Sequence, residues 1–134
     1  MTLETAIDAE ITFAAGIPGF PNARRFAMQA WGDDDSPFIL LECLEDANLA
    51  FVIAAPWLFY PDYVIDIDDA TVEKLGLRSA EDAGVYCIVT IGDEAKDSTL
   101  NLLGPIVVNR RSGSATQVVL HDSGYEVRAP ITGA

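Results

Sequence analysis

The sequence predicts an all-β protein, a small antiparallel β-barrel of about ten short strands with one short helix near residues 69–75. Short apolar runs recur at nearly regular spacing with turn residues between them, as in barrels and sandwiches. Few segments show the 3.6-residue periodicity of a helix. A Gly104-Pro105 pair also joins two apolar runs, which is where a sheet is expected to turn a corner.

The expected strands follow one another along nearly the whole chain. Residues 85–91 form a continuous apolar and β-branched run, which is typical of a strand buried on both faces. The polar loop at residues 109–114 contains glycine and joins two β-prone runs, which predicts a hairpin. The ten segments expected as strands are 11–14, 25–31, 37–41, 49–54, 63–67, 85–91, 100–103, 106–108, 116–120 and 125–128.

The tip of this hairpin carries two arginines, Arg110 and Arg111, on a chain that is otherwise strongly negative. We interpret the tip as a solubilising loop. A contact site for an acidic group is the alternative, because loops often carry binding residues.

A single short helix is expected at residues 69–75. Either Asp68 or Asp69 can accept hydrogen bonds from the free N–H groups at its start, as N-cap residues do. Val72 and Leu75 repeat at helical spacing, and Gly76 can adopt the left-handed conformation that ends a helix.

The composition bounds the class of protein. A chain of 134 residues fits one domain, expected over residues 1–134. Its formal net charge of −13 argues against direct nucleic-acid binding and favours basic partners. Cys43 and Cys87 lie in apolar surroundings and are expected to be reduced core residues. The sequence shows neither a bilayer-spanning stretch nor a signal peptide, so we expect no membrane partner and a cytoplasmic protein.

The chain offers little for catalysis or metal binding. His121 is the only histidine and lies beside Asp122 at an expected turn. The acidic run at residues 33–35 lacks the glycine and the twelfth-position glutamate of a calcium loop. The 21 acidic residues make chance pairs common, and none is singled out as a general acid and base. We expect a binding protein with no catalytic residues, no cofactor and no metal.

Two segments are candidates for binding a partner. The stretch from Trp57 to Tyr60 places large apolar side chains at consecutive positions, including Phe59, and a strand cannot bury them all because its side chains alternate. They either cover the end of the barrel, which is the interpretation we favour, or anchor a partner. Asp66, Asp68 and Asp69 form an acidic cluster, in which strand alternation places Asp66 and Asp68 on one face. Taken singly, Asp68 and Asp69 are better interpreted as the solvated start of the helix.

Four ordered blocks of this sequence resemble the FliW family of flagellar assembly factors. The first is Gly16-Ile17-Pro18-Gly19-Phe20, and the second is Pro37-Phe38 followed by residues 41–46. The third comprises residues 49–52, Pro56 and residues 61–63, and the fourth comprises residues 99–109 and 117–120. The chain departs from the family pattern at Glu42 and Cys43, where Gln and Ser are usual, and at Gly104, where Ala is commoner.

The resemblance implies a cytoplasmic, mostly β-barrel protein without catalytic activity. FliW proteins bind flagellin and also bind the RNA-binding regulator CsrA, relieving its repression of flagellin translation. For CsrA, which must be basic to hold RNA, we predict the acidic cluster Asp66, Asp68 and Asp69 ahead of residues 33–35. For the amphipathic helices of flagellin, we predict a groove walled by Trp57, Phe59 and Tyr60.

Two other classes of function are weighed against this one. The first is a β-barrel that binds a small apolar molecule in its interior, which requires a cavity where short strands more naturally leave packed side chains. The second is a glycosidase-like enzyme with two carboxylates facing one cleft. The flagellar interpretation is preferred because its four blocks cover nearly the whole chain in order.

Overall fold

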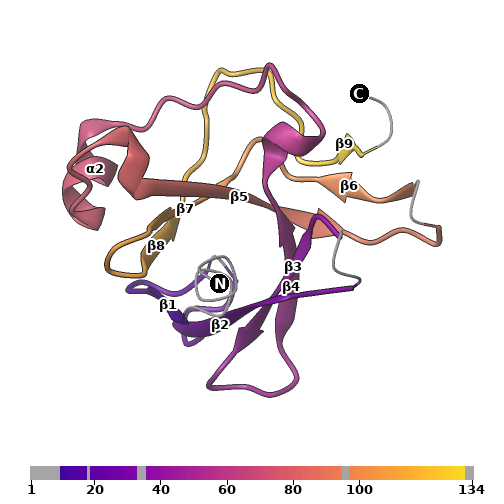
Figure 1. The fold of residues 1–134 in the computed structure, drawn as a ribbon, viewed down its shortest axis with the longest axis horizontal. Helices are drawn as coiled ribbons and strands as arrows, with labels where there is room; N and C mark the ends of the chain where they lie inside the picture. The colour runs from indigo at the N-terminus through magenta and orange to yellow at the C-terminus, as the bar shows by residue number, and fades with distance from the viewer. Residues whose placement is uncertain (1–9, 18, 33–35, 95–96, 132–134) are drawn as a thin grey trace.

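Seven strands close into a barrel and two further strands extend its sheet in the computed structural model (Figure 1). The structure describes residues 10–17, 19–32, 36–94 and 97–131. Within these ranges the barrel strands are β1 (Glu10–Phe13), β2 (Arg25–Ala30), β3 (Phe38–Cys43), β4 (Ala50–Ala54), β5 (Ala83–Thr90), β7 (Ile106–Asn109) and β8 (Ser114–Gln117). The two further strands are β6 (Thr99–Leu100) and β9 (Ala129–Pro130).

The order around the barrel is β4-β3-β2-β1-β8-β7-β5, and the pairing of β4 with β5 closes it. The predicted all-β barrel is confirmed. Its neighbouring strands are antiparallel except β1 and β8, which run parallel with Thr12 opposite Ser114. These two strands are distant in sequence, so no tight turn fixes their relative direction.

Strand β5 is the longest and organises the barrel. Its first half pairs with β7, with Tyr86 opposite Ile106, and its second half pairs with β4, with Cys87 opposite Ala54. Its last residues pair with β6, which continues through β9 beyond the barrel. Both faces of β5 are largely covered, as its continuous apolar run predicts.

The Gly104-Pro105 pair forms the predicted corner between β6 and β7. The backbone N–H of Gly104 donates to Asn101 Oδ1 at 2.9 Å, and Gln117 Nε2 donates to the Gly104 carbonyl at 2.7 Å. A Cβ atom on Gly104 would lie 3.0 Å from Gln117 Nε2. The glycine is therefore needed for close packing at the corner rather than for a left-handed backbone.

The predicted helix is confirmed as α2 (Asp69–Leu75). Asp68 is the N-cap, and its side chain accepts a hydrogen bond from the Thr71 N–H. Gly76 ends the helix in the left-handed conformation with φ of 69°. Two short 3-10 helices, η1 (Pro56–Leu58) and η2 (Ala80–Asp82), complete the elements of the described residues. No helix in this part of the chain has the length and apolar character needed to cross a bilayer.

Two of the expected strands are wrong and two are shorter than expected. Residues 63–67 and 125–128 contain no strand, while β6 ends at Leu100 and β8 ends at Gln117. Their backbone groups pair irregularly instead: the N–H groups of Leu102 and Leu103 both donate to the Glu126 carbonyl. Alternating burial thus arises here from packing on the core, without the regular pairing that defines a strand.

The apolar residues form two clusters. One fills the barrel interior, where Phe13 and Phe26 meet edge to face with ring centres 5.5 Å apart. The other packs against the opposite face of β5 and includes Tyr63, Cys87, Leu100 and Leu102. Segments 55–65 and 118–131 cover this second cluster, and both cysteines remain free and buried.

Candidate partner-binding surface

The aromatic stretch that follows β4 contains both buried and exposed residues. Pro56 is buried at the start of η1, whereas Trp57 and Leu58 are 39% and 62% exposed. Phe59 is half-buried and stacks on Phe38. Tyr60 is also half-buried, and its hydroxyl donates a hydrogen bond to the Pro130 carbonyl. The structure therefore does not gather Trp57, Phe59 and Tyr60 into one exposed wall.

Tyr63 fixes the position of Trp57. The Tyr63 ring is buried, and its hydroxyl donates to the Leu102 carbonyl at 2.7 Å. Trp57 Nε1 donates to the Tyr63 carbonyl at 2.7 Å, and the two rings meet edge to face. Burial raises the pKa of Tyr63 well above its usual range and raises the pKa of the neighbouring Cys87 thiol to about 12. Trp57 is thus held by a rigid, neutral support.

Replacing Tyr63 with phenylalanine should cost about 1–2 kcal/mol of unfolding free energy at pH 7, because the Leu102 carbonyl loses its donor. The difference in unfolding free energy between the variant and the unsubstituted chain should become smaller above about pH 10. There Tyr63 ionises in the unfolded state and stays protonated in the folded state, so stability falls as the pH rises. Urea unfolding of both chains at pH 7 and pH 11 measures this, and an equal difference at the two pH values would contradict it.

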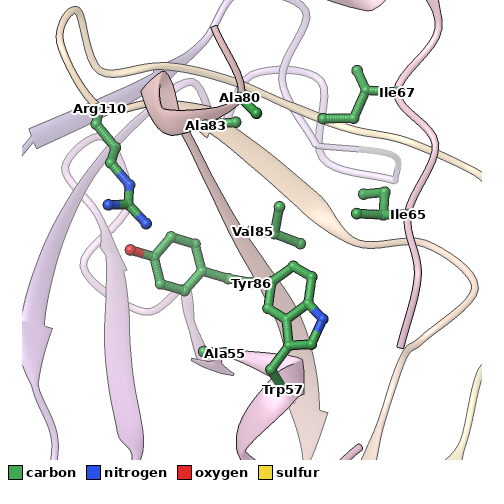
Figure 2. A pocket seen from close by; sticks show the side chains of 9 residues that line it. All are labelled: Ala55, Trp57, Ile65, Ile67, Ala80, Ala83, Val85, Tyr86 and Arg110. Carbon is green, nitrogen blue, oxygen red and sulfur yellow. The ribbon is translucent and has the colours of Figure 1, made fainter. Parts of the chain in front are cut away.

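Trp57 forms one wall of a pocket of about 360 Å³ that also includes residues of β5 (Figure 2). Ile65, Ile67 and Val85 form apolar walls, and Tyr86 with Arg110 forms the remaining side. Figure 2 shows the Arg110 guanidinium extending toward the Tyr86 ring. We call this the Trp57–Arg110 pocket.

The predicted acidic cluster borders this pocket. Ile65 and Ile67 line the pocket, while Asp66 and Asp68 alternate with them and are exposed. Hydrogen bonds from Thr71 hold the pKa of Asp68 below its usual value. Asp69 is exposed in the first turn of α2, where a negative charge is favourable. Asp68 therefore has a structural role as a cap, and Asp66 has none that the structure displays.

The remaining candidates for chemistry are dispersed. Among the described residues, no three or more histidine, cysteine or acidic side chains gather as metal ligands would. His121 is exposed at a turn, and the acidic run at residues 33–35 lies outside the described residues. The barrel interior, where a small apolar ligand was the alternative, contains the buried side chains of Phe13, Phe26 and Leu41.

The Trp57–Arg110 pocket is not predicted by the sequence. The sequence places Arg110 at the tip of a hairpin and predicts a strand at residues 63–67. The alternation of Ile65 and Ile67 with acidic residues was the available signal that one side of this segment is covered. Nothing in the sequence places that side against Tyr86 and Arg110, because the contact depends on the closed barrel.

A family model described as FliW protein matches residues 1–131 of this chain. The chain belongs to the FliW family. The resemblance expected from the four sequence blocks is therefore confirmed. Departures at Glu42, Cys43 and Gly104 are accommodated in the barrel: Cys43 is buried, Glu42 is exposed, and Gly104 lies at the corner described above.

Curated relatives and a solved structure agree with this family. The chain is 45% identical to flagellar assembly factor FliW of Bacillus licheniformis over 126 residues, which cover 94% of this chain and 87% of the relative. It is 42% identical to the Bacillus subtilis protein of that name over 123 residues, covering 92% and 85%. A crystal structure of the flagellar assembly factor FliW superposes with a TM-score of 0.84 at 34% identity, covering 91% and 84%.

Proposed function

We propose that this chain is a cytoplasmic flagellar assembly factor, a single barrel domain over residues 1–134 without catalytic activity. It binds flagellin, and it binds the RNA-binding regulator CsrA, which relieves repression of flagellin translation. The observation that carries the proposal is the family match over residues 1–131, together with relatives named flagellar assembly factors. The net charge and the surface described above support it.

Charge favours an RNA-binding regulator as one partner. A protein that holds RNA needs a basic surface to neutralise phosphates. This chain carries a formal net charge of −13, and Asp66, Asp68 and Asp69 are exposed together before and at the start of α2. Opposite charges accelerate encounter and make the affinity sensitive to salt. We therefore assign the acidic cluster to CsrA.

Reversing two charges of the cluster, Asp66→Lys with Asp69→Lys, should slow CsrA association several-fold at low salt. Asp68 is left unchanged because it caps α2. Stopped-flow association rates at low and high salt measure the effect, which should shrink at high salt because ions screen exposed charges.

The matched control is Asp93→Lys with Glu126→Lys, which alters the net charge equally at exposed positions outside the cluster. If both double variants slow CsrA association equally, the cluster is not the CsrA site. An unchanged association rate in the cluster variant would lead to the same conclusion.

The exposed part of the aromatic stretch is the surface that we assign to flagellin. Trp57 combines a large apolar ring, partial exposure and a fixed orientation, which are features of residues that dominate protein interfaces. Leu58 extends the apolar surface beside it. The next two residues are anchored to the rest of the fold. Phe59 stacks on Phe38, and the Tyr60 hydroxyl donates to the Pro130 carbonyl.

Trp57→Ala should weaken flagellin binding by about tenfold or more, because interface tryptophans commonly contribute at this level. Trp31→Ala is the matched control, since Trp31 is also 39% exposed and also meets another aromatic ring edge to face. Calorimetric titration of both variants with flagellin measures the difference. Equal affinities for the two variants, with both chains folded, would show that Trp57 is not at the site.

The proposal as a whole is tested by titrating the purified chain separately with flagellin and with CsrA. We expect saturable binding to each protein. Absence of binding to both proteins would contradict the proposed function.

A further inference from the structure

We propose that the Trp57–Arg110 pocket binds an acidic peptide segment of a partner protein, in which a large apolar side chain lies next to an aspartate or glutamate. The apolar side chain enters the pocket, and the neighbouring carboxylate pairs with Arg110. This inference deepens the proposed function, on which it rests in so far as Trp57 belongs to the surface assigned to flagellin.

The pocket is suited to an apolar side chain. Its volume of about 360 Å³ lies within the range of sites that enclose small ligands. Trp57, Ile65, Ile67 and Val85 present apolar surface to it, and Tyr86 closes one side (Figure 2). The hydrogen bond from Trp57 to the Tyr63 carbonyl holds the largest wall of the pocket in place. Ordering this wall on binding therefore costs little conformational entropy.

The charge at the pocket is opposite to that of the whole chain. Arg110 is the only charged residue among those that line the pocket, although the chain carries a net charge of −13. Its guanidinium forms no ion pair with any described residue, whereas the neighbouring Arg111 pairs with Asp82 at 3.6 Å. An exposed guanidinium beside apolar walls is suited to a carboxylate, which it can bind through two N–H groups.

A glycine allows Arg110 to lie at this position. A Cβ atom on Gly84 would come within 3.3 Å of Arg110 Nε and within 3.2 Å of the Tyr86 ring. The lack of a side chain at Gly84 therefore lets the arginine lie across β5 beside the aromatic ring. Any residue other than glycine would crowd this arrangement.

The surroundings of the pocket differ between its two sides: Asp66 and Asp68 border the side of Ile65 and Ile67, whereas further cations lie on the side of Arg110. Lys74, Arg78 and Arg111, together with Asn109, line a second, more polar pocket of about 490 Å³. With Arg110, four of the eight lysines and arginines of the chain line these two pockets. Glu73 and Asp82 are the carboxylates that accompany them. Additional acidic residues in a bound segment could pair with Lys74, Arg78 or Arg111.

Selection from a displayed peptide library tests the chemistry directly. The library holds random segments fused at their carboxyl ends, so that only side chains supply carboxylates, and the full-length chain is the target. We expect enriched peptides to carry aspartate or glutamate within two positions of leucine, isoleucine, methionine or an aromatic residue. Enrichment of peptides without carboxylates, or no enrichment, would overturn the proposal.

A titration then locates the site. The most enriched peptide, acetylated and amidated at its ends, is titrated into the unsubstituted chain, Arg110→Gln and the matched control Arg128→Gln, an exposed arginine that lines neither pocket. We expect Arg110→Gln to weaken binding by about fivefold to tenfold and Arg128→Gln to leave it unchanged. Equal affinities for the two variants would overturn the proposal.

The inference and the proposed function fail in different ways. If flagellin binds but no acidic peptide is selected, or if Arg110→Gln leaves the affinity for the peptide unchanged, the inference is overturned and the proposed function stands. If an acidic peptide binds through Arg110 but neither flagellin nor CsrA binds, the peptide chemistry is supported and the proposed function is contradicted.

Discussion

Phe26→Ala is expected to lower the free energy of unfolding by about 3–5 kcal/mol, the largest loss among the substitutions considered. Phe26 is fully buried in the barrel interior. Its ring meets the Phe13 ring edge to face, with ring centres 5.5 Å apart, and its ring centre lies 6.1 Å from that of Phe51. Removing the ring leaves a cavity among side chains from several strands, and the closed barrel limits how far they can move to fill it.

Urea unfolding followed by far-ultraviolet circular dichroism measures this loss. Phe20→Ala is the matched control, because it deletes the same atoms from a side chain that is 45% exposed and still contacts Phe51. The control should lose no more than about 1.5 kcal/mol. Similar losses for the two variants would contradict the assignment of Phe26 to the barrel core.

Asn109→Ala is expected to cost about 2–4 kcal/mol, because it removes the polar centre that joins α2 to the hairpin. The side chain is buried, and its Nδ2 donates to the Leu75 carbonyl at 2.7 Å. Its Oδ1 accepts from the N–H groups of Arg111 and Ser112. Alanine would leave these groups without their partners at the helix end and in the hairpin loop.

Thermal unfolding of Asn109→Ala should be compared with that of Asn48→Ala, which makes the same substitution at an exposed position. The control should stay within about 0.5 kcal/mol of the unsubstituted chain. Because Arg110 follows Asn109 directly, we also expect the variant to bind the acidic peptide more weakly. A variant as stable as the control would contradict the role assigned to the buried amide.

Features that depend on neighbouring residues could be predicted from the sequence. The helix α2 has the bounds expected from its aspartate cap and its terminal glycine, because both signals act within one turn of the helix. The corner at Gly104-Pro105 was predicted for the same reason. Its glycine, however, is required by the approach of Gln117, which lies on another strand and leaves no local signal.

Features that depend on distant segments could not be predicted. The alternating pattern of residues 63–67 resembles that of a strand, but these residues are covered on one side by the barrel surface and pair with no strand. The parallel pairing of β1 with β8 likewise involves segments about a hundred residues apart. For the site, the sequence indicates Trp57 and the acidic cluster as candidates, but it does not predict that Trp57 lines a pocket together with Arg110.

The central claim is that the exterior of this barrel binds proteins through the Trp57 surface and through the acidic cluster. Nuclear magnetic resonance of the isotope-labelled chain, titrated separately with flagellin and with CsrA, tests it most directly. We predict that flagellin shifts the signals of Trp57, Leu58 and their neighbours, and that CsrA shifts those of residues 66–69. Shifts confined to other parts of the barrel, or no shifts with either protein, would contradict the claim.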